Sequence, residues 1–196
     1  MLDQLIFFLE LGFFHVLDFK ALDHVLFLIV LALPFALKHW KDLIIIVSLF
    51  TIGHTISMFI VYVGLVPHSN NWIELLISLS IVVVATKNIF ANKKSLKGYN
   101  RNGFYWIVTF FFGTVHGLGF GSFYRLVTPQ GEAFESLVGF ALGVEAAQLL
   151  VVSMVVLLNS ILNRVIKLEE FFWILLVSAL VLIQATRMAI GVIIEF

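Results

Sequence analysis

The residues with the most chemical potential are a few ionisable side chains inside long apolar stretches. A charged group in the middle of a membrane-spanning helix costs about 2.5–3.5 kcal/mol on insertion scales, so such a residue suggests binding, pairing or catalysis. The chain has no cysteine, which leaves imidazole and carboxylate as its metal-binding groups. These groups suit borderline divalent ions such as Ni²⁺, Co²⁺ or Zn²⁺. The candidate ligands are Asp23, His24, His54, His116 and Glu145.

Polar neighbours at helical spacing accompany these candidates. Residues three or four apart share a helix face, so Thr51 falls beside His54, and Gln148 falls beside Glu145. Thr51, Ser57 and Gln148 are therefore expected to support the ligands. A simpler interpretation stays open, because buried histidines also serve as hydrogen-bond partners between helices.

The composition requires a membrane environment for these residues. Hydrophobic residues make up 61% of the 196 residues and charged residues 12%, with a mean hydropathy of +1.08. A soluble domain is nearer half apolar and a quarter charged. The sequence shows neither the alternating pattern of a membrane barrel nor a basic block for nucleic acid. It predicts a single integral membrane domain over residues 1–196, made of helices.

The spans follow from the lengths of the apolar stretches. A spanning helix needs about 20 apolar residues, and the segment at 4–17 is shorter than that. We therefore expect an all-α, polytopic membrane helix bundle with six long spans plus a short N-terminal helix. The six long stretches lie at 21–37, 42–66, 72–91, 103–127, 133–162 and 170–194.

The distribution of Lys and Arg predicts the orientation. Cytoplasmic loops carry an excess of these residues, and here the basic loops lie near 38–41, 87–101 and 164–167. The intervening turns at 18–22, 67–71 and 124–132 are poor in them. We expect the basic loops in the cytoplasm, and these turns and the C-terminus outside. The expected location is the inner (cytoplasmic) membrane of a bacterium.

Glycines at four-residue steps predict close helix packing. Small residues at this spacing let helix backbones approach each other. The two glycine-bearing spans, 103–127 and 133–162, are expected to be neighbours, which would bring His116 close to Glu145. The glycines are Gly113, Gly117 and Gly121 in the first span, and Gly139 and Gly143 in the second.

The same segments resemble the HupE/UreJ family, small membrane proteins regarded as nickel or cobalt permeases of hydrogenase and urease systems. The resemblance implies that His15, together with the Asp23–His24 pair, belongs to the site. Seven residues separate His15 from Asp23, more than in the best-described members, and the glycine-rich segment has one histidine rather than two, so the chain looks like a divergent second branch. The similar stretches are LGFFHVLDFKALDHVLFLIVLAL (11–33), FTIGHTISM (50–58), ELLISLSIVVVATKNIF (74–90), GTVHGLGFG (113–121) and GVEAAQLLVV (143–152).

Three functions are compatible with this pattern. The leading one is a permease for a divalent transition-metal ion (Ni or Co, or else Zn), with a site open to the outer side. The second is a membrane-embedded zinc hydrolase acting on a lipid, in which the histidines hold Zn²⁺ and a carboxylate acts as base. The third is a structural subunit without a substrate. A transporter is favoured over an enzyme, the partners are the lipid bilayer and the metal ion, and a homo-oligomer stays open.

Overall fold

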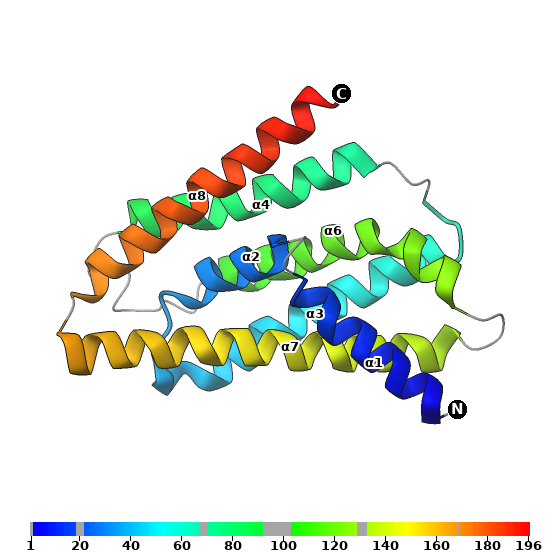
Figure 1. Cartoon of the computed structure of the whole chain (residues 1–196), viewed down its shortest axis with the longest axis horizontal. Helices are drawn as coiled ribbons and strands as arrows, with labels where there is room; N and C mark the ends of the chain where they lie inside the picture. Colours follow the sequence, from blue (N-terminus) through cyan, green and yellow to red (C-terminus); the bar gives the residue numbers. More distant parts are fainter. Residues whose placement is uncertain (1, 19–21, 67–69, 92–102, 129–132, 168) are drawn as a thin grey trace.

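The computed structural model describes residues 2–18, 22–66, 70–91, 103–128, 133–167 and 169–196 (Figure 1). Within these ranges the chain is helical and contains no strand. The helices are α1 (Leu2–Val16), α2 (Asp23–Ala32), the short η1 (Leu37–His39), α3 (Trp40–Tyr62), α4 (Asn70–Phe90), α6 (Phe104–Val127), α7 (Ala133–Ile161), η2 (Leu162–Ile166) and α8 (Glu170–Ile194).

Five of these helices are long and apolar enough to cross a membrane: α3, α4, α6, α7 and α8. Their outward faces carry exposed apolar side chains such as Ile107 and Leu180. In water this surface would be unstable, whereas lipid solvates it. The prediction of an integral membrane helix bundle is therefore confirmed.

The prediction of a long span at 21–37 is wrong. This stretch forms only α2, which has 10 residues and ends at Ala32. Pro34 follows, and proline has no backbone N–H with which to continue the hydrogen bonds of the helix. The chain turns there, with the Phe35 amide donating to the Ala32 carbonyl at 2.9 Å. Hydropathy counts apolar residues across this break and therefore overestimates the helix.

The helices α1 and α2 lie in series and meet inside the bundle (Figure 1). With 15 and 10 residues they rise about 22 and 15 Å, so together they match a hydrocarbon layer of about 30 Å. The turn at 18–22 was predicted for the outer surface, but its residues 19–21 lie outside the described ranges. Residues on either side of it, His15 and His24, contact the middle of α3 and α6.

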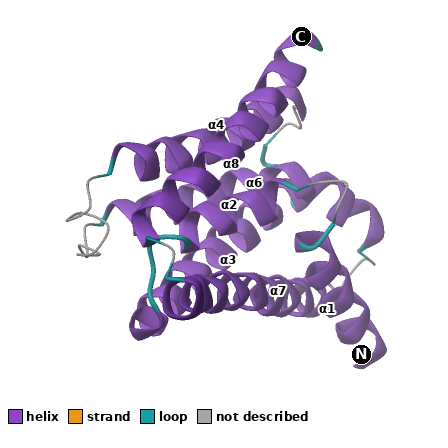
Figure 2. Ribbon diagram, turned by 60° about the vertical axis from the view of Figure 1, so that its left-hand side comes forward, coloured by secondary structure: helices purple, strands orange, loops and turns teal. Residues whose placement is uncertain are grey.

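The helices pack as close pairs: α3 on α6, α1 on α7 and α4 on α8. Figure 2 shows α4 and α8 on one side, α7 and α1 on the other, and α2, α3 and α6 between them. A Cβ at Gly117 would overlap the His54 carbonyl of α3, and one at Gly143 would overlap the Leu9 carbonyl of α1.

The two glycine-bearing helices do touch, with the ring centroids of Phe120 and Phe140 4.9 Å apart, but the prediction that they pack through their glycines is wrong. Gly113 and Gly121 of α6 also face α3, and Gly139 of α7 faces α1. Glycine spacing indicates that a close partner exists but carries no information on which helix supplies it. Here α1 and α3 supply it.

Candidate metal centre

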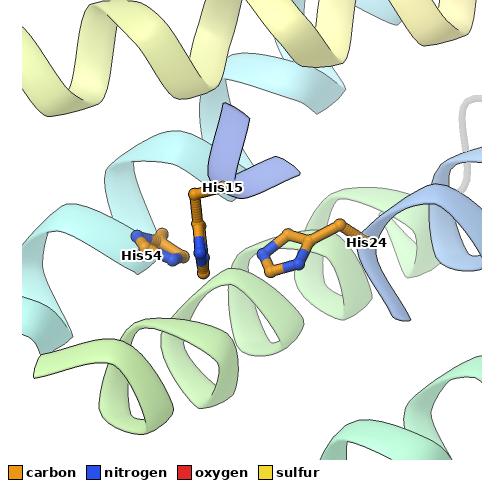
Figure 3. Close-up of side chains that lie close together, drawn as sticks. All are labelled: His15, His24 and His54. Carbon is orange, nitrogen blue, oxygen red and sulfur yellow. The ribbon is translucent and has the colours of Figure 1, made fainter. Parts of the chain in front are cut away.

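Four helices bring the candidate ligands together. His15 lies in the last turn of α1, Asp23 and His24 in the first turn of α2, His54 in α3 and His116 in α6. Figure 3 shows the rings of His15, His24 and His54 turned toward one another. The ring centroids of His15 and His24 are 4.7 Å apart, and those of His24 and His116 are 4.5 Å apart. The break between α1 and α2 thus places three ligand candidates at mid-depth.

Two overlapping groups of donor atoms have the spacing for a metal ion. His15, His24 and His54 form the first group, and Asp23, His24 and His116 form the second. Within each group the donor atoms lie within 4.8 Å of one another. Ligands at about 2.1 Å in a tetrahedral zinc site are about 3.4 Å apart, so closing either group onto an ion requires side-chain shifts of about 1 Å.

Hydrogen bonds determine which nitrogen of two rings is available to an ion. The Nδ1–H of His116 donates to the Phe112 carbonyl at 2.9 Å, because a carbonyl can only accept. Its Nε2 therefore carries the lone pair and lies 3.9 Å from Oδ2 of Asp23. The other oxygen of Asp23, Oδ1, is 3.1 Å from Nδ1 of His24 and leaves Nε2 of that ring available. A carboxylate that orients a histidine in this way is typical of metal sites.

Five of the other ring nitrogens are buried without hydrogen-bond partners among the described residues. They are Nε2 of His15, His24 and His116, and both ring nitrogens of His54. Leaving a buried polar atom unpaired lowers the free energy of unfolding by about 1–3 kcal/mol, and several such atoms lie together in this cluster. Such a set is expected where the nitrogens have a ligand to bind.

A cavity of about 350 Å³ leads to the cluster. It extends along α4 and α6 toward the N-terminal end of α4 and the C-terminal end of α6, and its lining includes His15, Asp23, His24, Glu74, His116 and Ser122. His54 does not line it. The His54 ring is 1% exposed and stacks near Phe50 and Phe140, with interplanar angles of 22° and 20°.

Glu145, the sixth candidate ligand, lies outside both groups. The hydroxyl of Ser48 donates to its Oε1 at 2.7 Å, and the hydroxyl of Thr51 contacts its Oε2. Thr51 also lies 3.0 Å from Oε1 of Gln148. Two of the predicted supporting residues, Thr51 and Gln148, thus accompany Glu145 rather than a histidine ring.

The third predicted supporting residue, Ser57, contacts backbone only. Its hydroxyl is 3.0 Å from the Gly53 carbonyl and 3.1 Å from the His54 carbonyl, and it has one hydrogen for the two. Sequence reasoning missed Ser48, although it lies three residues before Thr51 on the same helix face. It also missed the rings of Phe50 and Phe140, which no polar pattern marks.

Comparison with known proteins supports a family assignment. A family model described as "HupE / UreJ protein" matches residues 1–193. No curated protein and no solved structure shows significant similarity to the chain. The family match covers almost the whole chain, including all four helices that carry the histidine cluster. The chain therefore belongs to the HupE/UreJ family.

Proposed function

We propose that this protein is a permease that moves a divalent transition-metal ion across the membrane. The observation that carries the proposal is the buried set of unpartnered ring nitrogens on His15, His24, His54 and His116, with Asp23 beside them. Four imidazoles and one carboxylate favour Ni²⁺, Co²⁺ or Zn²⁺ over harder ions such as Mg²⁺. The ion is the cargo of the protein in this proposal.

The interrupted crossing formed by α1 and α2 supports transport. Membrane transporters often bind their substrates near the middle of the bilayer, where a helix is broken into two halves. Here the C-terminal end of α1 supplies His15, and the N-terminal end of α2 supplies Asp23 and His24. Non-helical backbone at membrane depth is tolerated where protein surrounds it or where it lines a water-filled cavity.

Polar groups lie on both sides of the cluster. On one side is the cavity that Glu74 and Ser122 help to line. On the other side, toward the start of α3, come Thr51, then Glu145 and Ser48. Beyond them, a pocket of about 240 Å³ is lined by Lys38, Asn159, Asn163 and Arg164, among others. The side-chain oxygens of Ser48, Glu145 and Asn159 can contact a cation on this side of the cluster, whereas Lys38 and Arg164 cannot coordinate one.

The direct test is transport into liposomes that contain the purified protein and an enclosed metal-sensitive dye. The wild type is expected to admit at least one of Ni²⁺, Co²⁺ and Zn²⁺ faster than protein-free liposomes. His24→Ala should abolish this flux, whereas His39→Ala, at the start of α3, should leave it unchanged. Equal flux in the wild type and His24→Ala would exclude the proposed route. No contact among the described residues favours the lipid hydrolase, since the one carboxylate in the two groups, Asp23, is engaged with His24.

The proposed orientation places the cavity outside and the basic loops in the cytoplasm, because Lys and Arg concentrate in cytoplasmic loops. The chain has no native cysteine, so single cysteines can report on each side. In intact cells, Ser122→Cys should react with a membrane-impermeant thiol reagent, and Asn100→Cys should react only after lysis. The reverse pattern would invert the proposed topology.

A further inference from the structure

The two groups of donor atoms in the centre share one residue, His24. The first group adds His15 and His54 to it, and the second adds Asp23 and His116. Among the described residues, no group within the same 4.8 Å limit contains both His54 and His116. The five side chains thus form two overlapping groups of donors that share His24.

The two groups differ in access. Asp23, His24 and His116 all line the cavity, so an ion in that volume meets this group directly. Of the three ligands in the other group, His15 and His24 also line the cavity, whereas His54 does not and stacks near Phe50 and Phe140. We call the first the cavity position and the second, made by His15, His24 and His54, the interior position.

The shared histidine allows the two positions to be filled only in turn. Nδ1 of His24 is held by Asp23 at 3.1 Å, which leaves Nε2 as its one nitrogen for a metal. One lone pair cannot coordinate two ions at once. Each position also offers only three protein donors, fewer than the four to six that these ions take, so coordination sites remain for an incoming ligand.

We propose that the ion passes from the cavity position to the interior position by ligand exchange around His24. Asp23 and His116 capture the ion, His24 stays bound, and His15 and His54 replace the first two ligands. The ion keeps at least one protein ligand throughout the exchange. Because neither position fills its coordination shell with protein donors, the ion can also leave either position. This inference rests on the proposed function, and it assigns capture to one set of ligands and hand-over to the other.

Single variants should distinguish binding of the ion from its passage through the protein. His54→Ala removes only an interior ligand, so Zn²⁺ binding measured by calorimetry should stay within about threefold of wild type, while flux into liposomes falls by at least about 10-fold. His116→Ala removes only a capture ligand, so binding should weaken by about 10- to 100-fold, and flux should recover at high Zn²⁺ concentration. The wild type should bind one ion per chain.

A spectroscopic measurement keeps the test independent of stability. Co²⁺ at the cavity position should give the same visible absorption spectrum in wild type and in His54→Gln, which retains a buried polar side chain of similar size. His116→Gln should change that spectrum. Two ions per wild-type chain, a His54 variant that binds as weakly as His24→Ala, or a His54 variant with wild-type flux would each overturn the two-position pathway. Absence of any binding by the wild type would instead overturn the proposed function itself.

Discussion

The histidine cluster and the Glu145 cluster both use side chains of α3, about one helical turn apart, yet their polar atoms are satisfied differently. At the histidine cluster, both ring nitrogens of His54 are buried without a partner among the described residues. At the Glu145 cluster, each carboxylate oxygen contacts a hydroxyl, one from Ser48 and one from Thr51. Polar residues on neighbouring turns of one helix thus take part in two different kinds of site.

The difference indicates what each cluster contributes. A hydrogen bond between transmembrane helices stabilises by about 0.6–2 kcal/mol, so the Glu145 cluster ties α3 to α7. One polar atom of the Glu145 cluster, Nε2 of Gln148, has no hydrogen-bond partner among the described residues. The unpaired nitrogens of the histidine cluster instead lower the free energy of unfolding of the metal-free protein. Binding of an ion to these nitrogens raises that free energy again. The first cluster is suited to holding helices together, and the second to holding a ligand.

The largest expected difference is in metal affinity. His24 is common to both ion positions, so His24→Ala should weaken Zn²⁺ binding by at least about 100-fold. Glu145→Gln keeps the size of the side chain and lies outside both groups, so its affinity should stay within about threefold of wild type. Calorimetric titration of the detergent-solubilised proteins at pH 7.5 measures both. If Glu145→Gln loses as much affinity as His24→Ala, the two clusters act as one site.

The second expected difference is in pH dependence. Imidazole binds a metal only when neutral, and its unperturbed pKa is near 6.5, so protons compete with the ion at the histidine cluster. Affinity is therefore fully present at high pH and is lost as falling pH protonates the rings, by about tenfold per pH unit for each histidine that titrates. Glu145→Gln should show the same pH profile as wild type. A wild-type affinity that stays constant down to the lowest pH at which the protein remains folded would contradict histidine ligation.

The sequence predicted the membrane bundle and its short N-terminal helix, but not the short α2. Apolar composition and helix length are properties of local segments, so the five long spans could be recognised directly. The end of α2 has a local signal in Pro34 that hydropathy ignores, whereas the series arrangement of α1 and α2 depends on how the rest of the bundle covers them. A hydropathy pattern does not record that.

The residues of the histidine cluster could be predicted from the sequence, but the contacts that separate them from Glu145 could not. Histidine and aspartate inside apolar segments are costly, and this marked Asp23, His24, His54 and His116. Only the family resemblance indicated His15. The separation of Glu145 depends on which face of α7 meets α3, and glycine spacing pointed toward α6 instead. Helix pairing determines these contacts, and no single segment encodes it.

The smallest expected difference is in the stability of the metal-free protein. His54→Leu replaces two unpaired buried nitrogens with an apolar side chain, so the free energy of unfolding should stay the same or rise by about 1 kcal/mol. Glu145→Leu leaves the hydroxyls of Ser48 and Thr51 without their acceptor, so that free energy should fall by about 1–2 kcal/mol.

Thermal unfolding in detergent with a chelator present compares these two variants, and added Zn²⁺ supplies the internal control. An ion that binds only the folded state raises the unfolding temperature by an amount that grows with the logarithm of its affinity. Zn²⁺ should therefore stabilise Glu145→Leu by as many degrees as wild type, even though that variant starts lower. If instead His54→Leu destabilises the metal-free protein more than Glu145→Leu does, the histidine nitrogens already have partners in the folded chain, and the contrast between the two clusters fails.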